Sequence, residues 1–195
     1  MDFNSFWESK HEGNDTFYLT GSKLNDIDHY HNILGFDNLK QMSFLEIGVG
    51  HGNLSHELVN LVGKLICCDI SSKALDKVSD KVYTKHLTND IKNIESVDFI
   101  LCHLVLQHCN DVEVGRIINE TNLNKDGIMS IQVAFLIDKT TPINVDGNVH
   151  FFRNLSDMEN IISKTNKKII STSPTFNFNN EFKNIGWCVI KLMNK

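Results

Sequence analysis

Hydrophobic residues after about residue 40 fall in short runs that alternate with segments of helical spacing. The short runs predict seven strands, at residues 43–47, 64–70, 82–87, 97–102, 128–135, 168–172 and 186–193. Segments with apolar residues three and four apart predict helices at 53–62, 71–78, 112–123 and 156–165. This alternation predicts an α/β fold, a mostly parallel sheet with helices on both faces and the last strand antiparallel.

Polar and turn-forming residues mark where these elements begin and end. Asn53 and Ser71 are predicted helix N-caps, and the stretch from Ser156 to Glu159 matches a capping box. The pair Asp126 and Gly127 predicts a turn into the fifth strand, and Pro174 with the Asn-rich stretch 177–180 predicts a turn before the last one. Residues 1–40 differ from the rest, and helical spacing at 22–34 predicts a helical cap on the core at 41–195.

The first predicted strand leads into a loop with glycine at alternate positions. It reads Glu46-Ile47-Gly48-Val49-Gly50-His51-Gly52 and precedes a predicted helix. Glycines allow a sharp turn and let a ligand approach the backbone, and free N–H groups at a helix start favour a negative charge. A plain tight turn would need the same glycines, so the loop alone does not establish a ligand site.

Two acidic positions on the following strands strengthen the ligand interpretation. Asp69 ends the second strand, where a carboxylate can accept hydrogen bonds from both hydroxyls of a ribose. Its structural alternative is a cap for the helix that starts at Ser71. Asn89, Asp90 and Ile91 follow the third strand, where they could hold and cover an adenine, although Asp90 taken alone fits a turn.

Taken in order, these motifs resemble the class I S-adenosylmethionine-dependent methyltransferases, which have a Rossmann-like fold. The loop from Glu46 to Gly52, Asp69, the stretch 89–91 and the strand-four region 97–108 carry the resemblance, over about residues 43–135. The resemblance implies S-adenosylmethionine as the cofactor, with S-adenosylhomocysteine as the product. A nicotinamide-dependent oxidoreductase is a weaker alternative, because the loop lacks the third glycine of G-x-G-x-x-G. A second alternative is a non-catalytic partner subunit that binds the cofactor.

The resemblance also implies individual roles on the cofactor. Gly48 and Gly50 lie against its methionine part, and Glu46 supports the amino group. Asp69 binds the ribose and Ile70 packs on the adenine, whose edge is held by the stretch 89–91. His51 stands where a small or apolar residue is common, and no role follows for it. The N-terminal residues Trp7, Tyr18 and Thr20 are expected to close over the cofactor as a lid.

Five side chains are candidates on the side of the methyl acceptor. His103 follows strand four, where it would face the transferring methyl, and histidine titrates near neutral pH, so it is the predicted general base. His108, His150, Arg153 and Trp7 are predicted to border the acceptor, although His108 could instead pack against or cap the following helix. Arg153 could hold an anionic group, or could form a surface salt bridge instead. The short chain favours a small-molecule acceptor methylated on O or N, such as a sugar or a natural-product intermediate.

Composition and charge limit the classes of partner and the location that the sequence predicts. The formal net charge of −5 disfavours nucleic acid, and we interpret Lys164, Lys167 and Lys168 as a solvated helix end. Five cysteines without CxxC spacing predict reduced, mostly buried thiols in a cytoplasmic protein. No apolar run reaches the ~18 residues of a membrane span. His11, His29 and His31 could suggest a metal site, but His29 and His31 lie two apart, on different faces of a helix, so we expect none. A monomer or homodimer with one domain over 1–195 is expected.

Overall fold

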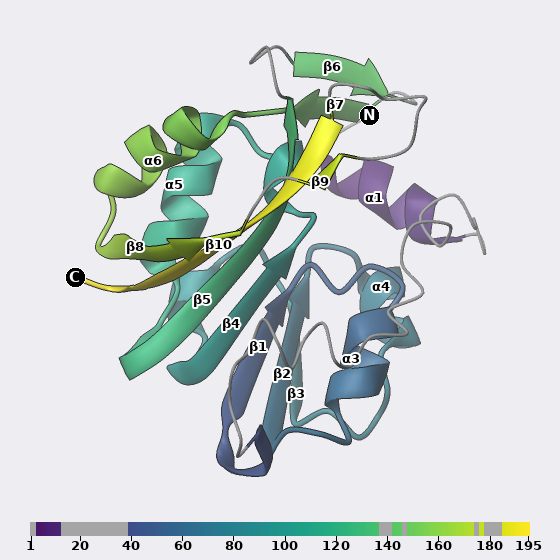
Figure 1. Ribbon diagram of the computed structural model, residues 1–195. Helices are drawn as coiled ribbons and strands as arrows, with labels where there is room; N and C mark the ends of the chain where they lie inside the picture. The colour runs from purple at the N-terminus through teal and green to yellow at the C-terminus, as the bar shows by residue number, and fades with distance from the viewer. Residues whose placement is uncertain (1–2, 13–38, 137–141, 146–147, 174–175, 178–184) are drawn as a thin grey trace. The chain divides into compact units, whose positions relative to one another are not determined.

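The computed structural model describes residues 3–12, 39–136, 142–145, 148–173, 176–177 and 185–195 (Figure 1). The chain divides into two units, Met1–Asn89 and Asp90–Lys195. The predicted helix at 22–34 and the turn at Pro174 and 177–180 lie outside the described residues. The seven predicted strands are all present, three in the first unit and four in the second, so the strand prediction is confirmed.

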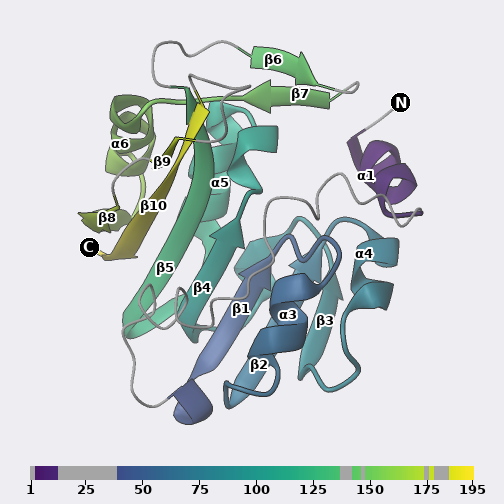
Figure 2. The same cartoon turned by 45° about the vertical axis from the view of Figure 1, so that its right-hand side comes forward.

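The first unit contains three parallel strands in the order β3-β2-β1 (Figure 2). They are β1 (Ser43–Ile47), β2 (Lys64–Asp69) and β3 (Thr84–Leu87). β1 and β2 are buried along almost their whole length because helices cover them. These helices are α3 (Asn53–Leu58) and α4 (Ser72–Lys77), and α1 (Phe3–Glu12) packs against α4. A 3-10 turn, η2 (Leu39–Gln41), precedes β1.

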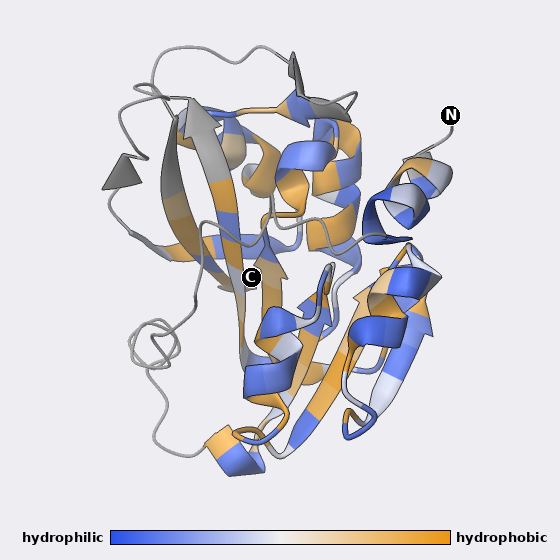
Figure 3. Cartoon of the chain, turned by 90° about the vertical axis from the view of Figure 1, so that its right-hand side faces the viewer, coloured by the Kyte–Doolittle hydropathy of each residue, from blue (hydrophilic) through white to orange (hydrophobic). Residues whose placement is uncertain are grey.

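The second unit is built on β4 (Val97–His103) and β5 (Leu123–Leu136), which run parallel. The last strand, β10 (Ile185–Asn194), is antiparallel both to β5 and to β8 (Lys167–Thr172), as predicted. The helices α5 (Asp111–Glu120) and α6 (Leu155–Ser163) pack on each other, and both carry hydrophobic and hydrophilic stretches (Figure 3). Two 3-10 turns, η3 (Ile91–Asn93) and η4 (Leu106–His108), flank β4.

Three strands were missed by the sequence analysis. The pair β6 (Pro142–Val145) and β7 (Asn148–Phe151) forms an antiparallel hairpin where a loop was expected. The two-residue strand β9 (Phe176–Asn177) pairs with β10. All three are at most four residues long, which is too short for an apolar alternation to be recognised.

Helix caps differ from the prediction at two of three positions. Ser71 caps α4 as predicted, since its hydroxyl accepts a hydrogen bond from Ala74 N (3.2 Å). The N-cap of α3 is Gly52 in a left-handed conformation, and Asn53 is the first helical residue. In α6 the capping box is made by Asn154 and Asp157, each side chain accepting from the other's backbone N–H. Asn154 has the extended backbone of an N-cap, so the helix begins at Leu155, one residue before Ser156.

Two further local predictions are wrong. Asp126 and Gly127 lie inside β5, where the register with β4 shifts so that residues 123–128 oppose 97–99. The turn signal therefore marks an irregularity within a strand. Lys167 is buried, at 1% exposure, and its ammonium donates to Thr121 O (3.0 Å) and Asn166 Oδ1 (2.9 Å). Only Lys164 and Lys168 are exposed as expected. All five cysteines are buried free thiols.

Candidate functional site

The glycine loop after β1 takes a conformation that only glycine adopts without strain at three positions. Gly48, Gly50 and Gly52 have φ values of 75°, 53° and 76°. The Gly48 N–H donates to Cys68 O (2.8 Å) and the Gly52 N–H to Val49 O (2.8 Å), so the turn is fixed by backbone bonds. The loop thus presents main chain without side chains at alternate positions, at the carboxyl end of a parallel strand where ligands bind in such folds.

Glu46 is buried immediately before this loop. Its exposure is 3%, and its carboxylate accepts a hydrogen bond from the Ser55 hydroxyl of α3. Burial raises the pKa of Glu46 to about 8, and the neighbouring Asp69 carboxylate adds to this while the Ser55 bond opposes it. A cation that binds beside a buried carboxyl group favours its ionised form and lowers its pKa. Glu46 therefore suits the binding of an ammonium group.

Asp69, the last residue of β2, contacts the glycine loop. Its Oδ2 accepts from Gly50 N (3.2 Å) and its Oδ1 from Ser71 N (2.9 Å). Asp69 is therefore not the cap of α4, a role that Ser71 fills. The side chain is 8% exposed, and burial raises its pKa against the opposing backbone hydrogen bonds. The structure brings Glu46, Gly50 and Asp69 together as the sequence motifs predicted.

Helix α1 is attached to this region by its carboxylates. Glu8 Oε1 accepts from Ser72 N (2.6 Å), and Oε2 accepts from the Ser71 hydroxyl (3.2 Å) and Lys73 N (3.4 Å). Glu12 forms an ion pair with Lys73. The free N–H groups at the start of α4 and the backbone hydrogen bonds that they donate lower the pKa of Glu8. These contacts hold the N-terminal helix beside α4.

Helix α1 also carries aromatic and imidazole rings next to these carboxylates. Trp7 is half-buried and stacks on His11, with ring centroids 5.9 Å apart. His11 is 8% exposed and meets the His51 ring edge-on at 5.4 Å. A Cβ placed on Gly50 would lie 4.0 Å from His11 Cε1, so this ring lies against the glycine loop. Trp7, the predicted lid residue, thus contacts the loop region through His11.

The predicted adenine-binding residues have unequal exposure. Ile70 is half-buried directly after β2, and Asn89 is exposed at the end of the first unit. In the second unit, Asp90 accepts from Asn93 Nδ2 (2.9 Å) and pairs with Lys92 (3.7 Å). Ile91 is 3% exposed and belongs to the core of that unit. Their roles stay predictions.

The loop after β4 is strained and contains an unpaired polar group. Leu104 has φ 58°, a left-handed value that costs a non-glycine residue about 1–2 kcal/mol. Its N–H donates to Gln132 O (2.8 Å). His103, the predicted base, is half-buried at the end of β4. Gln107 Oε1 is buried without a hydrogen-bond partner. Strain and unpaired groups of this kind cluster at functional sites.

The predicted acceptor residues His108 and His150 lie together. Their rings meet edge-on at 4.6 Å, and His150 stacks on Phe152 at 5.7 Å. The contact is possible because β7 packs against η4. Burial lowers the pKa of His108 to about 3, and the neighbouring His150 contributes. His108 is therefore neutral at physiological pH.

Arg153 forms its hydrogen bonds mainly with backbone and side-chain groups of the protein itself. Its guanidinium donates to Asp111 Oδ1 (2.9 Å), Leu106 O (3.0 Å), Phe151 O (3.0 Å) and Cys109 O (2.6 Å). The side chain is 5% exposed, while Asp111 is 72% exposed. These bonds fix both ends of η4 and join it to β7. They favour a positioning role, while contact with an anionic acceptor stays a prediction.

Several predicted residues lie outside the described part of the chain. These are Tyr18 and Thr20 of the expected lid, and His29 and His31. Among the described residues, no group of three or more His, Cys, Asp or Glu side chains is arranged to hold a metal ion. No described helix combines the length and apolar character needed to cross a bilayer.

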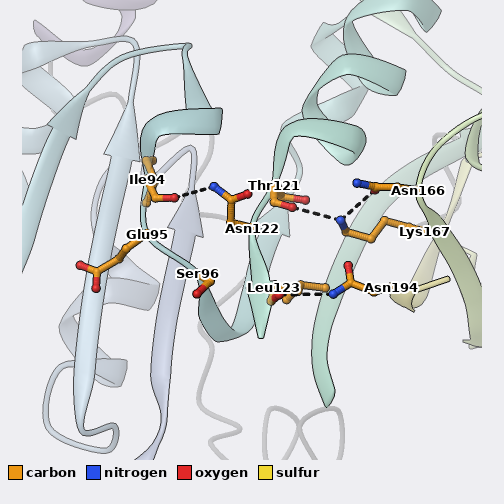
Figure 4. Close-up of a pocket in the computed structure, with 9 residues that line it drawn as sticks. All are labelled: Ile94, Glu95, Ser96, Thr121, Asn122, Leu123, Asn166, Lys167 and Asn194. Atoms are coloured by element: carbon orange, nitrogen blue, oxygen red, sulfur yellow. Dashed lines mark hydrogen bonds between the residues drawn. The ribbon is translucent and has the colours of Figure 1, made fainter. Parts of the chain in front are cut away.

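A hollow of about 540 Å³ lies in the second unit, at the edge where its parallel strands begin (Figure 4). Lys167 and the amides of Asn122, Asn166 and Asn194 line it. These polar groups bond to one another and to nearby carbonyls, such as Asn122 Nδ2 to Ile94 O (2.7 Å). Ligands in this class of sheet bind at the carboxyl ends of the strands, so this hollow is not the predicted site.

Three residues of the first unit that shape the site were missed by the sequence analysis. They are Glu8, His11 and Ser55. Glu8 and His11 are one helical turn apart, which places them close together on α1, but their partners are about 40 to 60 residues away. Ser55 is nine residues beyond Glu46, on another element. No local pattern indicates such contacts.

Comparisons with known proteins bear on the class of fold. Residues 45–129 match a family model described as a methyltransferase domain. Solved structures with a similar fold include DhpI in complex with S-adenosylhomocysteine, with TM-score 0.68, 13% identity and coverage of 98% of this chain and 94% of that chain. A Leishmania major S-adenosylmethionine-dependent methyltransferase gives TM-score 0.78, 11% identity and coverage of 97% and 81%. The N-methyltransferase NodS from Bradyrhizobium japonicum WM9 gives TM-score 0.70, 16% identity and 99% of both chains.

The fold is therefore the Rossmann-like α/β fold of these methyltransferases. The match over residues 45–129 and the structural neighbours confirm the resemblance carried by the sequence motifs, to the class I S-adenosylmethionine-dependent methyltransferase family. Among curated proteins no match was found.

Proposed function

We propose that the protein transfers the methyl group of S-adenosylmethionine to a small molecule. The observation that carries this proposal is the glycine loop with Asp69 bonded to Gly50 N and the buried Glu46 beside it. Gly48 and Gly50 would lie against the methionine part, Glu46 would hold the ammonium group and Asp69 the ribose. Ile70 would cover the adenine, and Asn89, Asp90 and Ile91 would hold its edge. Neighbours solved with this cofactor or its product support the same assignment.

The acceptor side is proposed to lie at the loop after β4. The bound cofactor supplies an already activated methyl group on a sulfonium, so the protein mainly positions the acceptor and excludes water. His103 would accept a proton from an acceptor hydroxyl or amine. The neutral ring of His108 and the ring of His150 would border the acceptor, and Trp7 and Arg153 are proposed for the same role. The proposal includes one domain over 1–195, a cytoplasmic location and a sugar or natural-product acceptor methylated on O or N.

Substitution of Asp69 tests the cofactor assignment. Asp69→Ala removes the acceptor oxygens for the ribose hydroxyls, worth ~1–3 kcal/mol, so we expect S-adenosylhomocysteine to bind about 5- to 150-fold more weakly by isothermal titration calorimetry. Asp80→Ala is the matched control, because Asp80 is a fully exposed carboxylate of the same unit. Unchanged affinity in Asp69→Ala, or tight binding of NAD by the wild type in place of S-adenosylhomocysteine, would contradict the proposal.

A further inference from the structure

Gln107 is a buried polar residue on the proposed acceptor side to which the proposed function gives no role. It lies in the middle of η4 and is 7% exposed. Its Oε1 is buried and accepts no hydrogen bond within the described part of the chain. A buried oxygen without a donor bears the full cost of losing its hydrogen bonds to water, so such atoms are rare in folded proteins. A donor that arrives with a ligand would remove this cost.

The chemistry of an amide gives Gln107 no means of relieving this cost by itself. Two other described side chains have a buried unpaired atom, His11 and Glu57, and these can change tautomer or protonation state. An amide has a single state, and turning it by half a revolution only exchanges the unpaired oxygen for an N–H group that needs a partner as well. The missing donor must therefore be brought to Gln107 by another molecule or by a movement of the chain.

The backbone on both sides of Gln107 is fixed by hydrogen bonds. The guanidinium of Arg153 donates to Leu106 O (3.0 Å) and to Cys109 O (2.6 Å). Cys109 N also donates to Leu106 O (3.2 Å), which closes η4. A shift of η4 toward a partner for Gln107 would break these bonds. The side chain alone can adjust, because the last torsion of a glutamine is broad and lets Oε1 turn toward the small part of the side chain that is exposed.

We propose that Gln107 Oε1 accepts a hydrogen bond from an O–H or N–H group of the methyl acceptor, next to the group whose proton His103 would take. The inference rests on the proposed function, since that function places the acceptor at the loop after β4. An acceptor that serves both residues carries two neighbouring donors, as a ring diol or an amino alcohol does. A site built to bind such a proton discriminates against analogues that lack it, because its own polar atom then stays unpaired. Gln107 is thus a specificity residue, and proton transfer stays with His103.

The first measurement needs no ligand. Gln107→Met keeps the length of the side chain and removes its amide, so the cost of the unpaired oxygen disappears. We expect the melting temperature of the free protein to rise by about 2 °C or more. Gln41→Met is the matched control, because Gln41 is an exposed glutamine in the 3-10 turn η2 and should leave the melting temperature unchanged. A melting temperature of Gln107→Met equal to or below that of the wild type would show that the amide supports the fold, and would overturn the inference.

Two probes with the same ring test recognition of the donors. The vicinal cis-diol of cyclohexane carries two neighbouring hydroxyls, and its dimethyl ether has methyl groups in place of both protons. In ligand-observed NMR titrations of protein saturated with S-adenosylhomocysteine, we expect the wild type to bind the diol about tenfold or more tightly than the ether. Gln107→Met should lose this preference, and Gln41→Met should keep it. Gln107→Glu retains an oxygen that accepts a hydrogen bond, whether protonated or not, so it should keep the preference too.

The remaining outcomes separate the inference from the proposed function. Equal affinity of the wild type for the two probes overturns the inference, as does a preference that persists in Gln107→Met because the ether is too large for the site. Loss of the preference in Gln107→Glu overturns it as well, since the amide would then act only through the shape of the loop. All three results leave the proposed function standing. If the wild type does not bind S-adenosylhomocysteine, the proposed function fails first, and the role of Gln107 fails with it.

Discussion

The glycine loop of the first unit and the loop after β4 in the second unit both leave a buried parallel strand through a left-handed residue. The first uses glycine, which takes this conformation without strain, and surrounds it with the carboxyl groups of Glu46 and Asp69. The second uses Leu104 and is held by the guanidinium of Arg153, with the neutral ring of His108 beside it.

The difference concerns the two sites proposed above, one for the cofactor and one for the methyl acceptor. The first loop combines unhindered backbone with ionisable groups whose charge can respond to a charged ligand. The second loop is held by the hydrogen bonds of one buried guanidinium, with the neutral ring of His108 beside it. The first region is the proposed site of the charged cofactor, and the second is the proposed acceptor side.

The strongest test of this contrast is removal of the guanidinium. Arg153→Ala removes the guanidinium from three carbonyl groups, of which Leu106 O still accepts from Cys109 N (3.2 Å), and leaves Asp111 without its ion pair. We expect the free energy of unfolding to fall by about 3–5 kcal/mol. Arg116→Ala is the control, because Arg116 forms its ion pairs on the half-exposed face of α5 and should cost ~1 kcal/mol or less. Urea unfolding measures both, and equal losses would show that Arg153 is not the support of its loop.

A second test concerns the buried carboxyl of the first region. The pKa of Glu46 is raised to about 8 in the folded protein, so the folded state binds its proton more tightly than the unfolded chain does. The stability from this proton is complete below about pH 4.5 and is lost as the pH rises through about 8, at ~1.4 kcal/mol for each tenfold difference in proton affinity. We expect Glu46→Gln to unfold at higher urea than wild type at pH 8, with the two converging near pH 5.

The control for this pH dependence is Glu159→Gln, an exposed carboxyl on α6. It should follow the wild type at both pH values. A Glu46→Gln variant that keeps the pH dependence of the wild type would show that Glu46 is ionised in the folded protein, contrary to its burial.

The smallest expected effect tests the backbone of the glycine loop. Gly52→Ala must hold a side chain at φ 76° and places its Cβ 3.2 Å from Lys77 O, so we expect a loss of about 1–2 kcal/mol in thermal or urea unfolding. Gly115→Ala is the control of opposite sign. Gly115 lies inside α5, and a Cβ placed there would contact only the Ile161 side chain of α6, at 3.7 Å. The free energy of unfolding should therefore rise by about 0.5–1 kcal/mol. A stabilised Gly52→Ala would remove the argument that the loop requires glycine.

Much of the site on the first unit was predictable, because its chemistry is encoded at the ends of adjacent elements. Glu46 and Asp69 lie at the ends of buried strands, Gly50 follows the first of them, and parallel pairing of β1 with β2 brings these strand ends together. The acceptor side was less predictable. Arg153 was expected to hold a ligand or a surface partner, but its main partners are backbone carbonyls of η4 and β7, which no sequence pattern reveals.

The sequence by itself determined the seven strands, the glycine loop and its acid partners, since these depend on local periodicity and on the conformations open to glycine. The tertiary structure alone decided which side chains surround the loop. It placed His11 against Gly50, Glu8 on the start of α4 and Lys167 inside the second unit. Such contacts join residues far apart in the chain, and their free energy comes from burial and charge that exist only after the chain has folded.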